Sequence, residues 1–319
     1  MSDLVSLAEI EEAAGRLPGV VVRTPLVPFP LSDPALLVKA ESLQPIGAFK
    51  VRGAYATIAG LPEDVRKRGV VTHSSGNHAQ AVAFTARALG IRAVLVVPNT
   101  APQVKVDACV ALGAEVLYVE PTMEARETTA ARLAEAHGLT LVPPYDDRRI
   151  VAGQGTAGLE IVRDRPDVDV VLVPIGGGGL ISGVAAAVKR LRPEAKVIGV
   201  EPQLAADARA SLLAGRPVSW TAAQTSRTSA DALRAQRVGD IPFAHIRAFV
   251  DDIVTVSEEE IRLTVRRLAR EARLIAEPGG AVATAAYLYR GDELPSARTY
   301  VSVLSGGNVD PAYLAEAIA

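Results

Sequence analysis

The stretch Val170-Val171-Leu172-Val173-Pro174-Ile175-Gly176-Gly177-Gly178-Gly179-Leu180 is the most informative part of this chain for its fold. Its first six residues are apolar and mostly β-branched, which predicts a fully buried strand. The alanine-rich segment that follows the glycines predicts a helix over 179–191. A buried strand, a glycine turn and a helix in this order are typical of a parallel α/β sheet.

The glycine loop also predicts a site for a phosphate group. Backbone N–H groups without side chains around them can converge on an anion, and a helix N-terminus favours negative charge. A tight turn that needs positive φ is the alternative, but such a turn rarely takes four glycines in a row. The predicted phosphate site consists of Gly176, Gly177, Gly178, Gly179 and the backbone of Leu180.

Two kinds of nucleotide site compete with this interpretation of the loop. No Gly-Lys-Ser/Thr sequence follows the glycines, so a P-loop is excluded. A dinucleotide-binding protein stays open, because Gly177, Gly179 and Ser182 partly match the Rossmann fingerprint. Glu201 ends the next predicted strand, roughly where an acid would bind the ribose.

Short β-branched runs alternate with longer alanine-rich runs along most of the chain, which predicts two α/β lobes. We expect a small α/β domain over 68–143 and a discontinuous large, cofactor-binding domain formed by 1–67 and 144–319. A cleft between the lobes, at the carboxyl ends of the strands, is the expected ligand site. The expected strands are 69–73, 92–98, 115–119, 139–142, 168–174, 195–200, 253–256 and 299–304. The expected helices are 77–89, 103–112, 123–137, 153–163, 179–191, one that begins after Ser257, and 280–289, and the stretch 203–246 looks irregular. Ser257 and Glu260, three residues apart, predict a capping box at the start of the helix that follows Ser257.

The composition bounds the class of protein. With 319 residues and a formal net charge of -2, the chain can bury a sizeable core and shows no sign of a nucleic-acid or anionic-membrane surface. Cys109 is the only cysteine, which excludes an intrachain disulfide and fits a reducing compartment. The start, Met1-Ser2-Asp3-Leu4, lacks the features of a secretion signal, and no apolar run is long enough to span a membrane. We therefore expect a cytoplasmic protein that acts on a small molecule.

Lys50, in the segment Ile46-Gly47-Ala48-Phe49-Lys50-Val51-Arg52-Gly53-Ala54, is a candidate covalent anchor for an aldehyde cofactor that carries a phosphate. The glycine loop would bind that phosphate. The segment Ser74-Ser75-Gly76-Asn77-His78 precedes a helix and suits a carboxylate or a phenolic oxygen, although ordinary helix capping explains it equally well. Ser305-Gly306-Gly307-Asn308 follows a predicted buried strand and is either a turn or part of the same site.

With these motifs the chain resembles the serine/threonine dehydratase and serine racemase family of pyridoxal-phosphate enzymes, which have the tryptophan-synthase-β-like fold (fold type II). The resemblance implies two lobes with parallel-rich sheets flanked by helices, an active site between the lobes, and a homodimer. It extends over nearly the whole chain. The segments that carry it are Arg23-Thr24-Pro25-Leu26, Lys50, Ser75-Gly76-Asn77-His78, Ala152-Gly153-Gln154-Gly155-Thr156, the glycine loop and Ser305-Gly306-Gly307-Asn308-Val309-Asp310.

The resemblance also implies a role for each matching residue. Lys50 would bind the cofactor covalently, and Phe49 would lie against the pyridine ring. Asn77 would hydrogen-bond the phenolic oxygen, and Ser305 would meet the pyridine nitrogen. The glycine loop from Gly176 to Leu180 would hold the phosphate. The substrate carboxylate would be bound by Ser74, Ser75, Asn77 and His78.

The implied activity is elimination from a small β-hydroxy-amino acid. Once the substrate amine displaces Lys50, the freed lysine is poised as the base for the Cα proton. A hydroxyl partner at the pyridine nitrogen favours prompt loss of the β-hydroxyl, so L-threonine or L-serine would give a 2-oxo acid and ammonia. Racemisation by Lys50 and Ser75 as opposing bases and a 3-hydroxyaspartate ammonia-lyase stay open. A β-replacement synthase is less favoured, because the sequence shows no site for a second nucleophile.

A divalent cation is a further implication of the resemblance. Glu201 and Asp207 would supply carboxylates and Ala205 a carbonyl, and oxygen-only ligands suit Mg2+, Ca2+ or Mn2+. Two solvated surface acids are the alternative.

Some positions depart from the family pattern. Ala232 replaces a glycine near the cofactor, and its methyl would crowd the substrate. Pro28-Phe29 and Pro45-Ile46 stand where nucleotide-activated racemases carry other residues, so we do not expect ATP activation. We also do not expect the C-terminal regulatory domain of biosynthetic threonine dehydratases.

Overall fold

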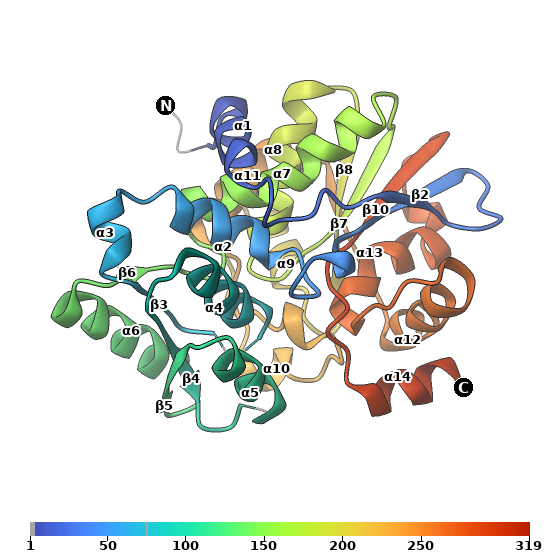
Figure 1. Cartoon of the computed structure of the whole chain (residues 1–319). Coiled ribbons are helices and arrows are strands. Elements are labelled where there is room, and N and C mark those ends of the chain that lie inside the picture. The colour runs from blue at the N-terminus through green and yellow to red at the C-terminus, as the bar shows by residue number, and fades with distance from the viewer. Residues whose placement is uncertain (1–3, 75, 102) are drawn as a thin grey trace.

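Two sheets organise the chain, and most of their strands are parallel (Figure 1). The structure, a computed structural model, describes residues 4–74, 76–101 and 103–319. The first sheet has the order β1 (Leu26–Pro28), β2 (Ala35–Ala40), β10 (Thr299–Leu304), β7 (Val170–Pro174), β8 (Lys196–Pro202), β9 (Asp252–Val256). The second has the order β5 (Glu115–Val119), β4 (Ala93–Pro98), β3 (Val70–Thr72), β6 (Thr140–Leu141). Every neighbouring pair is parallel except β1 and β2.

Strand β7 is buried on both faces of the six-stranded sheet. Val171 and Val173 pack in one core with residues of helix α8 (Gly179–Leu191). Val170 and Leu172 pack in another with residues of α12 (Glu258–Arg267) and α13 (Pro278–Tyr289). A parallel sheet covered on both faces accepts a continuous apolar run, and this is why the strand sequence does not alternate with polar residues.

The four-stranded sheet is also covered by helices that its own connections supply. Helix α4 (Asn77–Leu89) packs on one face together with α5 (Gln103–Ala111), and α6 (Met123–His137) packs on the other. The predicted α/β class, with parallel-rich sheets flanked by helices, is confirmed. The division of the chain into domains at residues 68 and 143 stays a prediction.

The structure corrects two details of the expected elements. Helix α7 (Arg148–Asp164) begins five residues before the predicted 153, because the Asp147 side chain accepts a hydrogen bond from the Arg149 N–H and caps the helix there. The stretch 203–246, expected to be irregular, contains helices α9 (Asp207–Ala214) and α10 (Ala222–Thr225) and the start of α11 (Asp240–Phe249). The capping box predicted for Ser257 and Glu260 is present at the start of α12.

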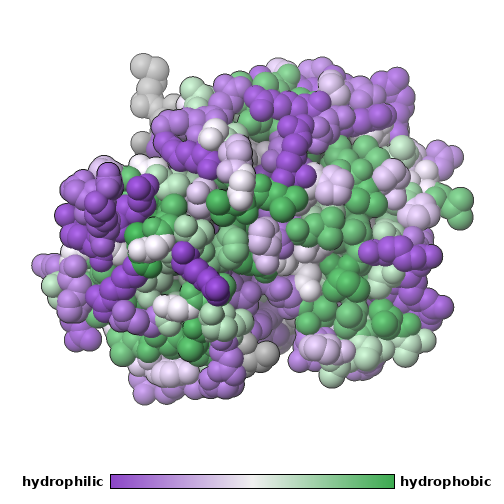
Figure 2. All heavy atoms as spheres, viewed as in Figure 1, coloured by the Kyte–Doolittle hydropathy of each residue, from purple (hydrophilic) through white to green (hydrophobic). Residues whose placement is uncertain are grey.

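The remaining helices complete the layers. They are α1 (Leu7–Arg16), α2 (Lys50–Ala59), α3 (Glu63–Lys67) and α14 (Pro311–Ile318), with short 3-10 or π turns at Glu41–Leu43, Asp231–Leu233, Leu268–Ala272 and Gly291–Glu293. On the face shown in Figure 2, polar and apolar residues are interspersed. Within the described residues, no helix has both the length and the apolar character needed to cross a bilayer.

Candidate active site

The carboxyl ends of β7 and β10 lie side by side, and each leads directly into a loop of the site. The glycine loop follows β7, and Ser305 follows β10. Three contacts join the segment before α2 to the end of β10. Ala48 forms a bridge with Gly306, the Phe49 N–H donates to the Ser305 carbonyl at 2.9 Å, and the Gly307 N–H donates to the Gly47 carbonyl at 2.8 Å. These contacts place the first residue of α2, Lys50, next to the end of β10.

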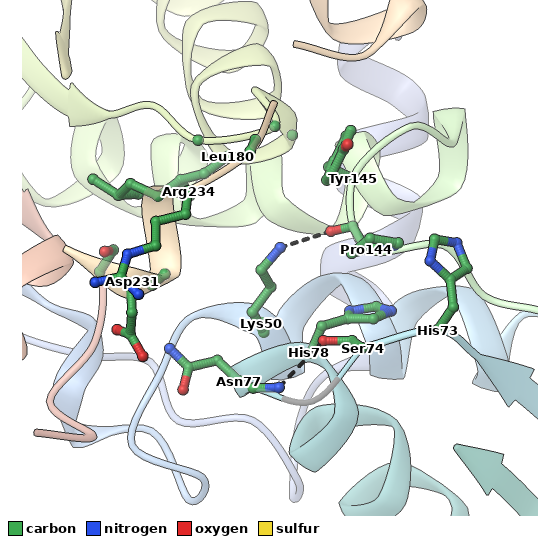
Figure 3. Close-up of a pocket in the computed structure, with 18 of the residues that line it drawn as sticks. Lys50, His73, Ser74, Asn77, His78, Pro144, Tyr145, Leu180, Asp231 and Arg234 are labelled. Carbon is green, nitrogen blue, oxygen red and sulfur yellow. Dashed lines mark hydrogen bonds between the residues drawn. The ribbon is translucent and has the colours of Figure 1, made fainter. Parts of the chain in front are cut away.

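Lys50 projects into a cavity of about 520 Å³, a volume typical of small-molecule sites (Figure 3). Its Nζ donates a hydrogen bond to the Pro144 carbonyl at 2.7 Å and lies 5.2 Å from the centre of the Phe49 ring. The surrounding protein lowers the pKa of Lys50 to about 8 by desolvating the ammonium, and Glu277, where it is ionised, acts in the opposite direction. A substantial fraction of this lysine is therefore a neutral, nucleophilic amine near neutral pH.

This pKa predicts how covalent attachment of an aldehyde to Lys50 depends on pH. Only the neutral amine attacks an aldehyde, and with a pKa of about 8 roughly a tenth of Lys50 is neutral at pH 7, against less than about a thousandth for an ordinary lysine. We expect the rate of attachment to rise through about pH 8 and then to level off. Stopped-flow absorbance after mixing the cofactor-free protein with pyridoxal phosphate measures that rate. A rate still rising in proportion to hydroxide above pH 9 would contradict the assigned pKa.

The glycine loop forms the wall of the cavity opposite the four-stranded sheet. Gly178 has a φ of 91° and is the N-cap of α8, a conformation that side chains rarely allow. A Cβ atom added at Gly177 would lie 2.2 Å from Cδ1 of Tyr145, so this position accommodates only glycine unless the ring or the loop moves. The first N–H groups of α8 have no intrahelical acceptor, so they are available to an anion. These features fit the phosphate of the predicted cofactor.

Asn77 is the first residue of α4, and its side chain is fixed by two neighbours in the cavity wall. Its Nδ2 donates to Oε1 of Glu277 at 2.8 Å, and its Oδ1 accepts from Nδ2 of Asn308, also at 2.8 Å. The same Asn308 nitrogen donates to the Ile46 carbonyl at 2.9 Å. The network joins α4, the start of α13, the segment after β10 and the segment before Lys50.

The segment predicted to bind the substrate carboxylate, residues 74–78, follows β3 and contributes several residues to the cavity wall. Ser74, Gly76, Asn77 and His78 line the cavity, whereas Ser75 lies outside the described residues. His78 is buried, and its Nε2 is 3.0 Å from the Val142 carbonyl. Burial and the nearby Lys50 charge lower the pKa of His78 to about 3, so its ring is neutral. His73, also in the cavity wall, was not predicted.

The predicted cation ligands are brought together but lie outside the residues that line the cavity. Glu201 is fully buried, and its carboxylate accepts hydrogen bonds from the N–H groups of Ala208 and Arg209 at 2.9 and 2.8 Å. Both carboxylate oxygens of Asp207 are buried without a hydrogen-bond partner of normal geometry, and Ala205 is fully buried. Two solvated surface acids, the alternative, do not describe this arrangement. The burial of Glu201 also removes the acid that the dinucleotide alternative placed at a ribose.

Besides His73, sequence reasoning missed three other parts of the site. Glu277 lies just before the first turn of α13, Tyr145 packs against the glycine loop, and the Pro144 carbonyl accepts from Lys50. Nothing local marks Glu277 as more than a residue before a proline. Tyr145 precedes two aspartates in a segment that reads only as a loop.

Comparisons with known proteins agree with this geometry. The pattern of the family described as pyridoxal-phosphate dependent enzyme matches residues 18–306. An L-threonine ammonia-lyase from Thermotoga maritima is 42% identical over 311 residues, which cover 96% of this chain and 76% of that protein. An L-threo-3-hydroxyaspartate ammonia-lyase from Saccharomyces cerevisiae is 38% identical, covering 95% and 93%. The crystal structure of a serine racemase from Dictyostelium discoideum has a TM-score of 0.90 and 36% identity, covering 96% and 99%. The chain belongs to the pyridoxal-phosphate dependent enzymes.

Proposed function

We propose that this enzyme is a dehydratase that converts a small β-hydroxy-amino acid, such as L-threonine or L-serine, to a 2-oxo acid and ammonia. The observation that carries the proposal is the placement of Lys50. Its amine lies in the cavity between the glycine loop and the loop after β3, with a pKa of about 8 (Figure 3). The similar L-threonine ammonia-lyase supports this choice of reaction.

The residues of the cavity fit pyridoxal phosphate. Lys50 would hold the aldehyde, the glycine loop the phosphate, Asn77 the phenolic oxygen and Ser305 the pyridine nitrogen, with Phe49 against the ring. When bound, pyridoxal phosphate withdraws electrons from Cα of an amino acid and so makes the Cα–H bond acidic. Ser305 is buried at the end of β10, and its hydroxyl, a weak acid, would leave the pyridine nitrogen largely unprotonated.

The side chains of the protein then move the protons. The neutral amine of Lys50, released by the substrate amine, removes the Cα proton. The β-hydroxyl must leave with a proton, and the Lys50 ammonium is the group that now carries one. Returning it to the departing oxygen yields water and restores the neutral lysine. Ser74, Ser75 and the backbone N–H groups of this loop, that of Asn77 among them, would hold the substrate carboxylate throughout.

A second candidate substrate is 3-hydroxyaspartate, which one observation favours. Arg126, on α6, lines the cavity, and its side chain donates hydrogen bonds to the Thr122 carbonyl and to Met123 Sδ. The other cationic side chains in the wall are engaged: Lys105 pairs with Asp231, and Arg234 donates to the Thr228 carbonyl. Among the described residues, Arg126 forms no ion pair within 4 Å, so its charge is available to a β-carboxylate.

A substrate panel tests the proposed function. L-serine, L-threonine and L-threo-3-hydroxyaspartate are incubated with the holoenzyme, and both 2-oxo acid and D-amino acid are measured. We expect 2-oxo acid to exceed D-amino acid by about tenfold or more with the preferred substrate. An excess of D-amino acid would replace the proposal with racemisation, and no turnover of any of the three would reject it.

Two variants sort the alternatives within the panel. With Ser75→Ala, D-amino acid formation is expected to collapse while elimination from the L-isomer partly survives, because Lys50 alone serves that reaction. With Arg126→Gln, the KM for L-threo-3-hydroxyaspartate is expected to rise about tenfold and that for L-serine to stay within about twofold, as expected for loss of one charged hydrogen bond. Equal changes for both substrates would remove Arg126 from substrate selection.

We also infer that Glu201, Asp207 and the Ala205 carbonyl bind a divalent cation. Burial raises the pKa of Asp207 to about 7, and burial together with the charge of Asp207 raises that of Glu201 well above its usual range. When both carboxylates are ionised and no cation lies between them, they repel each other. A set of ligands that consists only of oxygen atoms suits Mg2+, Ca2+ or Mn2+. Within the described residues there is no cluster of three His, Cys, Asp or Glu side chains, so the carbonyl is an essential part of this proposed site.

Thermal unfolding tests the cation site. Adding Mg2+, Ca2+ or Mn2+ to the chelated protein at about 100 times the dissociation constant is expected to raise Tm by about 5 °C or more. Asp207→Asn is expected to abolish the rise, whereas Asp292→Asn, at an exposed position, leaves it intact. An unchanged rise in Asp207→Asn would place the cation elsewhere.

We also propose that the enzyme is a homodimer and that it is located in the cytoplasm, as expected from the sequence analysis.

A further inference from the structure

Glu277 is a buried acid whose side chain does not serve the helix that it precedes. It is the N-cap residue of α13 and is 3% exposed, yet its carboxyl accepts no capping hydrogen bond from that helix. Instead the side chain extends into the wall of the active-site cavity. An acidic residue at a helix N-terminus ordinarily gains stability by capping it, so the orientation of Glu277 indicates another role.

The carboxyl of Glu277 contacts the side chain of Asn77. Its Oε1 accepts from Asn77 Nδ2 at 2.8 Å, and it lies so close to Gly306 that a Cβ atom there would be 2.5 Å from it. The Glu277 N–H donates to the Gly306 carbonyl at 3.0 Å, which fixes the backbone of the acid against the end of β10. The contact with Asn77 therefore fixes the side chain of Glu277, and the contact with Gly306 fixes its backbone.

The two neighbours of Asn77 determine which way its amide faces. Nδ2 of Asn308 can only donate, so the Asn77 oxygen must face it. The Glu277 oxygen accepts, so the Asn77 nitrogen must face that acid. A rotated amide would lose both hydrogen bonds. The second hydrogen of Asn77 Nδ2 is left for another acceptor.

Glu277 is not neutralised by a cation. Among the described residues it forms no ion pair within 4 Å, and the charges of Lys50 and Lys105 act on it only from a distance. Burial, with the nearby Asp231 charge, raises the pKa of Glu277 to about 8. At neutral pH the carboxyl is therefore largely protonated, and its remaining carbonyl oxygen is a neutral acceptor for Asn77.

We propose that Glu277 is a positioning residue, which holds the Asn77 amide so that its second N–H faces the phenolic oxygen of pyridoxal phosphate. The inference rests on the cofactor orientation of the proposed function but not on the substrate. It assigns to Glu277 an effect on the bound cofactor that acts through Asn77. Losing Glu277 and losing Asn77 are therefore expected to have the same consequence for the bound cofactor.

The test measures pyridoxal phosphate itself, by its absorption spectrum in the holoenzyme and by its dissociation constant from the protein. We expect Glu277→Leu to raise the dissociation constant about tenfold, the effect of one hydrogen bond, and to change the spectrum in the same way as Asn77→Ala. The double variant is expected to resemble Asn77→Ala alone. Glu277→Gln keeps an acceptor for Asn77, so it is expected to restore the spectrum and a dissociation constant within about twofold of the unmodified protein. Glu271→Gln, at a half-exposed glutamate paired with Arg267, is the matched control.

Independent effects of Glu277→Leu and Asn77→Ala that multiply in the double variant would overturn the inference, as would an unchanged spectrum in Glu277→Leu. Should Glu277→Leu fail to fold, Asn308→Ala is the second variant, because it removes the other hydrogen bond that orients the Asn77 amide. If the absorption spectrum of Asn308→Ala then differs from that of Asn77→Ala, the result counts against the inference. Because substrate turnover is not measured, a failed dehydratase assay leaves this test intact. A protein that bound no pyridoxal phosphate would instead remove the proposed function itself.

Discussion

Replacing Lys50 with alanine is expected to lower the rate of 2-oxo acid formation by about 10⁴-fold, the largest effect of any single change in this protein. The variant loses the covalent anchor and the base for the Cα proton together. It keeps the glycine loop and the Asn77 network, so pyridoxal phosphate is still expected to bind without covalent attachment. Borohydride reduction followed by mass spectrometry of the protein measures the attachment, and a coupled 2-oxo acid assay measures the rate.

The control for this variant is Lys67→Ala, which removes an exposed lysine paired only with Glu63. It is expected to leave both the attachment and the rate unchanged. Activity within about tenfold of the unmodified protein in Lys50→Ala, or reduction that still labels the protein at a single lysine, would assign the anchor to another residue.

Replacing Gly177 with alanine is the second change with a large expected effect. The new Cβ atom would lie 2.2 to 2.4 Å from three carbons of the Tyr145 ring, far inside van der Waals contact. The ring or the glycine loop must move, and overpacking of this kind costs about 1–3 kcal/mol. If the loop moves, the N–H groups proposed to bind the phosphate move with it. We expect the dissociation constant of pyridoxal phosphate to rise by up to about 100-fold, as measured by equilibrium titration of the cofactor-free protein.

The clash predicts a specific suppressor. Tyr145→Ala removes the ring, so the double variant Gly177→Ala/Tyr145→Ala is expected to bind pyridoxal phosphate more tightly than Gly177→Ala alone. Gly15→Ala is the matched control, because an added Cβ there meets no atom within 4 Å. If Tyr145→Ala does not relieve the effect of Gly177→Ala, contact with the ring is not its cause.

The sequence alone predicted those parts of the fold that depend on neighbours along the chain. The buried strand β7 and helix α8 follow from an apolar run, a glycine turn and an amphipathic segment, and the capping box at Ser257 follows from residues three apart. The start of α7 was predicted five residues too late, at Gly153, and the predicted helix already contained the two glycines Gly153 and Gly155. In the structure they lie inside the helix, where a Cβ atom would meet α2 and α8 at under 3 Å, so close packing explains them.

The candidate site depended on contacts between distant segments, which the pattern of one sequence does not contain. The pairing of residues 47–49 with 305–307 and the hydrogen bond from Asn77 to Glu277, 200 positions apart, are of this kind. The resemblance to a family supplied the roles of Lys50, Asn77 and Ser305. It gave no role to Glu277 or Tyr145, because these act on their neighbours through packing and hydrogen bonds seen only in three dimensions.

The position of β10 in the six-stranded sheet has a consequence for how the chain folds during synthesis. Residues 299–304 lie between β2 and β7, so both of those strands keep an open edge until residues 299–304 have been made. All strands of the four-stranded sheet, by contrast, lie within residues 70–141, so they can pair while the ribosome is still working. Exposed strand edges pair readily with other chains. A ribosome-bound intermediate that lacks β10 is therefore the stage at which this enzyme most needs a chaperone.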